Sequence, residues 1–218
     1  ETLKLIRKHV GPDVPVLNYI PGPLTLAGLL MGTDRLMMNI MKKPDLVHRT
    51  CEITLKAAKA YALAKIDCGG DVMVVADPTA SCSLISPKMF DTFAFPYLKD
   101  IFSFILEHDS VPSLHICGNT APILEKLADT GAKIIEIDHV VNLKDAKNRI
   151  GNRVCIQGNV DPSKVMLLGT PDEVYEISGK CIEEGGTGGG FILSTGCEVP
   201  LKAPIDNVKA MVRAGRES

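Results

Sequence analysis

One histidine and two cysteines have the residue types and the spacing of a metal site. His115 and Cys117 are separated by one residue within the segment 113–119, and Cys197 follows much later in the chain. Side chains two residues apart on a β-strand point to the same side of the sheet, so His115 and Cys117 would lie together. One imidazole and two thiolates make three protein ligands, the number that a catalytic zinc ion uses when its fourth position stays open. These residues therefore predict an open zinc site.

The alternative is that these cysteines are ordinary core residues, because cysteine is often buried and packs like a small hydrophobic side chain. The chain has seven cysteines, an odd and scattered set that argues against a disulfide framework. Both candidate segments end predicted strands and run into glycine-containing turns, which favours the metal site. The remaining cysteines have no histidine or cysteine at ligand spacing, and Cys155 is expected to fill a core layer.

The elements that must position these ligands form a regular series. Six short apolar segments, each followed by helical sequence, predict an α/β fold with a parallel sheet. In the segment 134–138, Ile135 and Ile137 alternate with Glu136 and Asp138. One apolar and one polar face fits a barrel with a site at its carboxyl end better than a doubly wound open sheet. The expected strands are residues 14–19, 72–76, 113–117, 133–138, 153–157 and 191–194.

The predicted fold is therefore a TIM (β/α)₈-type barrel, incomplete here because six strand–helix units cannot close an eight-stranded barrel. We expect residues 1–218 to form a single barrel domain, a C-terminal fragment of a longer chain that lacks two leading units. Unpaired strands at the edges facing the gap would favour pairing with another copy, so a homodimer is possible. A non-catalytic remnant of a barrel enzyme is one functional alternative.

Composition narrows the class of partner. The 218 residues are 45% hydrophobic, with a net charge of −2 and interspersed acidic and basic residues. No basic stripe is present, so a nucleic-acid partner is not expected. No apolar run reaches the length of a membrane span and no signal peptide opens the chain, so we expect a cytoplasmic protein without a membrane partner.

Three motifs resemble one family. Residues 155–162 contain Gly-Asn-x-Asp-Pro, residues 21–27 resemble a Gly-Pro-x-Thr segment, and residues 200–207 resemble a Thr-Pro-x-x-Asn stretch with Ala203 in place of Thr. All three are similar to segments of the uroporphyrinogen decarboxylase superfamily. The resemblance implies a TIM-type barrel whose present strands would be the third to the eighth.

The metal-binding residues resemble one branch of this superfamily. Decarboxylases carry Gly-His-Gly near the last strand, whereas this chain has Gly196-Cys197-Glu198. Together with His115 and Cys117, this segment is similar to the methylcobamide:coenzyme M methyltransferases. The resemblance implies zinc, a small thiol acceptor such as coenzyme M, and methylcobalamin or a methylated corrinoid protein as the methyl donor. A decarboxylase acting on the acetate side chains of a tetrapyrrole, without zinc, is the rival function.

Four further residues are candidates at the same site. The resemblance implies that Asp138 is an exchangeable fourth zinc ligand, and an outer hydrogen-bond acceptor or an interior salt bridge is the equal alternative. Asp77 ends its strand and would line the site with a catalytic role, and Asn18 and Asn159 would bind substrate. A helix-capping or turn role remains open for these three residues.

Overall fold

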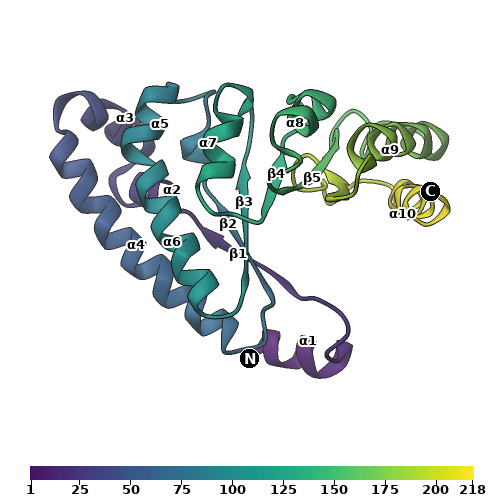
Figure 1. Cartoon of the computed structure of the whole chain (residues 1–218), viewed down its shortest axis with the longest axis horizontal. Coiled ribbons are helices and arrows are strands. Elements are labelled where there is room, and N and C mark those ends of the chain that lie inside the picture. Colours follow the sequence, from purple (N-terminus) through teal and green to yellow (C-terminus); the bar gives the residue numbers. More distant parts are fainter.

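A parallel sheet of six strands forms the centre of the computed structural model, which describes residues 1–218 (Figure 1). The strand order follows the sequence, and β1 does not pair with β6, so the sheet is open. The predicted α/β fold with an unclosed parallel barrel sheet is confirmed. The strands are β1 Leu17–Pro21, β2 Val72–Ala76, β3 Val111–Ile116, β4 Ile134–Ile137, β5 Cys155–Val160 and β6 Phe191–Thr195.

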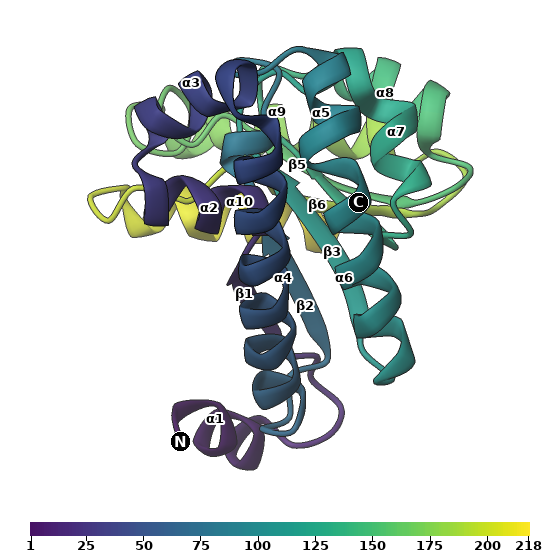
Figure 2. The ribbon, with the colours of Figure 1, turned by 90° about the vertical axis from the view of Figure 1, so that its left-hand side faces the viewer.

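Helices lie along one face of this sheet (Figures 1 and 2). Helices α4 and α6 pack on β1 and β3, and α8 and α9 pack on β5, with α10 against α9. None of the helices is both long enough and apolar enough to cross a membrane. The helices are α1 Thr2–Val10, α2 Pro23–Met31, α3 Thr33–Lys42, α4 Pro44–Ile66, α5 Pro87–Phe93, α6 Phe95–Glu107, α7 Leu124–Asp129, α8 Leu143–Ile150, α9 Pro171–Gly186 and α10 Ile205–Glu217, with short 3₁₀ turns at η1 Pro78–Ala80 and η2 Ala121–Ile123.

Local signals explain two helix starts and the start of the first strand. Thr170 and Glu173 form a capping box at the start of α9, each side chain bonding the backbone of the other residue. Pro44 begins α4 at a position where a missing N–H has no cost. The first strand begins at Leu17 rather than at residue 14, because Pro15 cannot donate a ladder hydrogen bond.

The two faces of the sheet are packed very differently. The face under the helices holds a core of 40 buried residues that includes Phe90 and Phe102. The inner face holds a small cluster of Val72, Val74 and Ile134, against which Cys155 packs as expected. Toward the carboxyl ends of the strands, this inner face becomes polar. The apolar volume that stabilises the fold therefore lies outside the barrel, and the interior is free for a site.

The two edge strands leave interior-facing side chains exposed. Leu17 and Tyr19 on β1 are 44% and 55% exposed, and Ile192 on β6 is 41% exposed. On a complete barrel these positions would face the opposite wall. The prediction of two further strand–helix units is compatible with these edges and stays a prediction.

Candidate metal centre

The three predicted ligands lie together at the carboxyl ends of the strands. His115 is in β3, Cys117 follows that strand, and Cys197 follows β6. The Nε2 atom of His115 lies 3.1 Å from Sγ of Cys117 and 3.9 Å from Sγ of Cys197, and the two sulfur atoms are 3.6 Å apart. All three open onto one cavity of ≈ 540 Å³. One nitrogen and two sulfur atoms within 4.8 Å of one another can hold a metal ion.

A close backbone contact brings Cys197 to His115 and Cys117. Gly196 donates its N–H to the carbonyl of Val160 at 2.8 Å, which continues the β5–β6 ladder beyond the strand. A Cβ atom on Gly196 would lie 2.2 Å from the backbone nitrogen of His139, in the loop after β4. The absence of a side chain therefore lets the segment after β6 cross β5 and approach β4. This crossing places Cys197 at the cavity.

Asp138 holds the loop that carries Cys117. Its Oδ2 atom accepts the N–H of Gly118 at 2.7 Å, and Oδ1 accepts the N–H of Val140 at 3.1 Å. His139 lies beside the same carboxylate, with Nδ1 2.8 Å from Oδ1, and its Nε2 is 3.5 Å from Asp161. His139 is thus partly exposed between two carboxylates. Asp138 therefore lies beside the Cys117 loop, and both of its oxygens accept backbone N–H groups.

Glu136 and Tyr19 also line the cavity, although neither was predicted there from the sequence. Glu136 is buried on β4, accepts the hydroxyl of Ser113 at 3.0 Å and that of Tyr19 at 3.3 Å, and lies 3.6 Å from Nδ1 of His115. That Nδ1 atom is buried without a hydrogen-bond partner. Burial raises the pKa of Glu136, while the charge of His115 opposes the rise. The register pairs His115 with Glu136 across β3 and β4, so the alternation in residues 134–138 was the signal available.

Asp77 occupies the N-terminus of α2 rather than the cavity. It is fully buried, and its Oδ1 atom accepts the N–H and the hydroxyl of Thr25 at 2.8 and 2.6 Å. Its Oδ2 atom accepts the N–H of Leu24 at 3.3 Å. Burial raises the pKa of Asp77 to about 6, although these hydrogen bonds oppose the rise. The capping alternative describes this placement, and the cavity is lined instead by Ala76 and Pro78 on either side.

The two asparagines also lie outside the cavity. Asn18 faces the helix layer near Gly70, because its neighbour Tyr19 takes the interior side of β1. Asn159 donates through Nδ2 to the carbonyls of Asp138 and Val141 at 3.1 and 2.7 Å. It therefore holds the turn after β4, the structural alternative left open for it.

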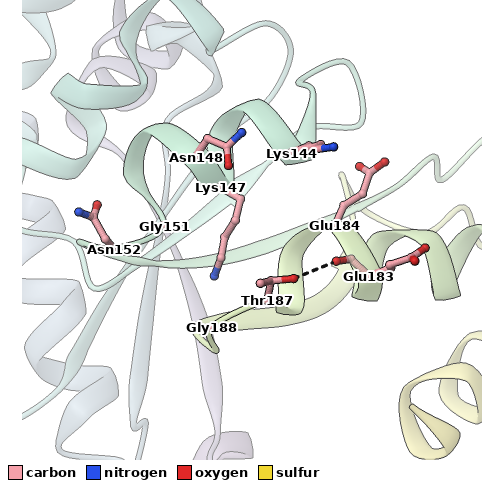
Figure 3. Close-up of a pocket in the computed structure, with 9 residues that line it drawn as sticks. All are labelled: Lys144, Lys147, Asn148, Gly151, Asn152, Glu183, Glu184, Thr187 and Gly188. Carbon is pink, nitrogen blue, oxygen red and sulfur yellow. Dashed lines mark hydrogen bonds between the residues drawn. The ribbon is translucent and has the colours of Figure 1, made fainter.

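A larger cavity than that of the three metal-binding residues lies at the other end of the strands and lacks the features of an active site. It has a volume of ≈ 750 Å³ between α8, the C-terminal end of α9 and the glycine-rich connection to β6 (Figure 3). No hydrophobic side chain lines it, and Lys147 donates to the carbonyl of Gly189. Its lining residues are Lys144, Lys147, Asn148, Gly151, Asn152, Glu183, Glu184, Thr187 and Gly188.

Comparisons with known proteins identify one family along the whole chain. The family model "Uroporphyrinogen decarboxylase (URO-D)" matches residues 1–218. The chain is 35% identical to the methylcobamide:CoM methyltransferase MtaA of Methanosarcina barkeri, covering 100% of this chain and 62% of that protein. It is 30% identical to the uroporphyrinogen decarboxylase of Synechocystis sp., covering 99% of this chain and 62% of that protein.

A solved structure shows the same fold. A methyltransferase from Methanosarcina mazei superposes with a TM-score of 0.92 at 36% identity, covering 99% of this chain and 62% of that chain. The chain therefore spans 62% of the length of the relatives that it matches. Because the family model covers its full length, the chain belongs to the uroporphyrinogen decarboxylase family.

Proposed function

We propose that this protein contributes the zinc site of a methyltransferase that moves a methyl group from a methylated corrinoid to a thiol. The observation that carries the proposal is the convergence of His115, Cys117 and Cys197 on one cavity. A decarboxylase has no need of two thiolates and an imidazole, so this convergence favours methyl transfer over the decarboxylase alternative. The names of the relatives, methylcobamide:CoM methyltransferases, support the same choice.

The donor set fits zinc. Two thiolates and one imidazole are ligands of catalytic zinc sites, and three protein ligands leave one position for a substrate. His115 directs Nε2 toward the two sulfur atoms, while Nδ1 lies on the side of Glu136. A carboxylate behind a ligand histidine is the usual outer partner of such sites. Bound zinc would supply one piece of chemistry here, the deprotonation of an acceptor thiol at neutral pH.

The chain's own residues would hold and orient the reacting groups. His115, Cys117 and Cys197 would hold the metal that positions the acceptor sulfur, and the carboxylate of Glu136, 3.6 Å from Nδ1, would favour the tautomer of His115 that leaves Nε2 free for the metal. In the proposed reaction, a bond forms between the acceptor sulfur and the methyl carbon. The cobalt–carbon bond of the donor breaks, and its electron pair stays on cobalt. Methylcobalamin or a corrinoid protein would be the donor, and coenzyme M or another thiol would be the acceptor.

We also propose that further strands complete the barrel beside β1 and β6. The exposed interior-facing side chains Leu17, Tyr19 and Ile192 support this proposal, because they are apolar or aromatic and lie on edge strands. Strands of a longer chain or of a second copy could fill this position. Sedimentation and mass measurement on the native protein distinguish the two sources.

The direct test is a methyl-transfer assay. The zinc-loaded protein is incubated with methylcobalamin and a series of thiols, and the formation of cob(I)alamin is followed by absorbance. We expect a thiol-dependent spectral change and one zinc ion per chain by metal analysis. A protein that binds zinc and transfers no methyl group to any thiol would contradict the proposed reaction.

Replacing Glu136 with alanine is expected to weaken zinc binding by roughly 10- to 100-fold, as for other outer partners of metal ligands. The carboxylate lies 3.6 Å from Nδ1 of His115, so its loss frees the ring to adopt the wrong tautomer or orientation. The matched control is Gln157→Ala, because Gln157 is the buried β5 neighbour of Glu136 in the register. Competition with a chelator measures both affinities, and equal values for the two variants would contradict the orienting role.

A further inference from the structure

The two sulfur atoms of the metal centre lie in contact with each other. Sγ of Cys117 and Sγ of Cys197 are 3.6 Å apart, although 80 positions separate the two residues in the sequence. Each of the two follows a strand, β3 for Cys117 and β6 for Cys197, and lies outside it. A disulfide has an S–S length of about 2.05 Å, so the two sulfur atoms need to approach by roughly 1.5 Å to form one. Rotation of side chains on connecting segments supplies a movement of this size.

The other five cysteines offer no such pair. Cys51 and Cys181 belong to the buried core, and Cys155 packs beside the cluster on the inner face of the sheet. All seven cysteines are free thiols, and direct contact between two sulfur atoms occurs only at Cys117 and Cys197. Oxidation to a disulfide within one chain is therefore directed to the metal centre.

Zinc and a disulfide exclude each other at this centre. A cysteine binds a metal ion as a thiolate, and a sulfur atom in a disulfide carries no thiolate charge. Closing the bond would leave His115 as the one remaining member of the three-residue cluster. A catalytic zinc site uses three protein ligands, so a single imidazole does not retain the ion. Conversely, bound zinc occupies both sulfur atoms and protects them from oxidation.

Resting on the proposed zinc site, we propose that Cys117 and Cys197 are a modification site for hydroperoxides, where a reversible disulfide forms and the metal is released. In the first step, one thiolate attacks a peroxide oxygen, the O–O bond breaks, and a sulfenic acid and a hydroxide form. In the second step, the other thiolate attacks the sulfenic sulfur, the S–O bond breaks, and a second hydroxide leaves. The two thiol protons convert both hydroxides to water, so two electrons from sulfur reduce one peroxide. A dithiol restores the two thiols by thiol–disulfide exchange.

The contact between the two sulfur atoms decides which oxidation product accumulates. Because the second sulfur lies 3.6 Å away, the second step is intramolecular and outruns attack by another peroxide molecule. A cysteine without such a partner proceeds instead to the sulfinic acid, which thiols do not reduce. Hydrogen peroxide is smaller than any thiol acceptor, so a metal centre that admits the acceptor also admits this oxidant. The paired cysteines thus make the oxidative loss of the metal reversible.

Mass spectrometry of the intact protein tests this assignment without any activity assay. Zinc-free protein treated with hydrogen peroxide is expected to lose about 2 Da, and dithiothreitol should restore the original mass. Peptide mapping should place the bond between Cys117 and Cys197. When free zinc exceeds its Kd by about 100-fold, about 1% of the chains are metal-free, so disulfide formation should slow about 100-fold. A chromogenic chelator should record the release of one zinc ion for each disulfide formed.

Single cysteine variants supply the decisive comparison. Cys117→Ser and Cys197→Ser each leave one thiol at the centre, so this thiol should gain about 32 Da as a sulfinic acid that dithiothreitol does not reverse. Cys155→Ser is the matched control and should form the wild-type disulfide, because Cys155 lies outside the metal-binding cluster. Sulfinic acid in place of the disulfide in the wild type, or equal oxidation rates with and without zinc, would overturn the assignment. Absence of methyl transfer to every thiol would overturn the proposed reaction instead, and these mass changes would still test the disulfide.

Discussion

Replacing Cys197 with serine is expected to lower zinc affinity by more than about 100-fold, because loss of an outer partner alone costs roughly 10- to 100-fold. Thiol-dependent methyl transfer should fall with it. A serine hydroxyl stays protonated at neutral pH and is a poor ligand for zinc, so His115 and Cys117 would remain as an incomplete set. Metal analysis after dialysis and the cob(I)alamin assay measure the two effects.

Cys155→Ser is the matched control for this substitution. Cys155 is also a half-buried cysteine on the inner face of the sheet, but it packs against Val72, Val74 and Ile134 and belongs to no metal-binding cluster. Its substitution should cost some stability and leave the zinc content unchanged. If Cys197→Ser keeps full zinc content and activity, or if the wild-type protein stays active after exhaustive chelation, the metal centre is refuted.

The sequence was sufficient to predict that His115, Cys117 and Cys197 lie together, because strand periodicity and the direction of the strands place them. Alternation along β3 sends His115 and the following Cys117 to the same side, whatever the rest of the chain does. Parallel strands bring all their carboxyl ends to one end of the barrel, so a cysteine just after β6 had to lie at that end. The fold and the position of the site are therefore consequences of local patterns repeated six times.

Residues whose partners are distant in sequence could not be placed in this way. Asp77 and Asp138 both directly follow strands, as an active-site carboxylate would. Each is instead held by backbone N–H groups of other elements, those of Leu24 and Thr25 for Asp77 and that of Gly118 for Asp138. The paths of the loops decide which unpaired backbone N–H groups lie near the end of a strand. No periodicity in the sequence predicts these paths.

The sequence alone did not show which side chains of β1 face the interior of the barrel. Asn18 is the polar residue of the segment and was expected in the site, yet Tyr19 lines the cavity. The position of Glu136 beside His115 could not be predicted either. This contact is fixed by the register between β3 and β4 and not by either strand alone. A shift of one residue exchanges the two faces of a strand, so such side chains need the register.

Gly196→Ala is expected to displace Cys197 from the metal centre without removing any ligand. The added Cβ would lie 2.2 Å from the backbone nitrogen of His139 and 2.9 Å from the carbonyl carbon of Asp138, and neither backbone atom can rotate away. The segment after β6 must therefore move outward by an ångström or so. A misplacement of that size can cost on the order of 100-fold in rate. Overpacking should lower the free energy of unfolding by about 1 to 3 kcal/mol.

The matched control separates loss of position from loss of stability. Gly179 lies inside α9, where an added Cβ meets no atom within 4 Å, so Gly179→Ala should stabilise the helix by roughly 0.5–1 kcal/mol. Zinc affinity and the rate of methyl transfer should then stay at wild-type values. In Gly196→Ala, both should fall at temperatures where circular dichroism shows the protein fully folded. If the folded Gly196→Ala variant binds zinc as tightly as the wild type, close packing of β6 against the loop after β4 is not what positions Cys197.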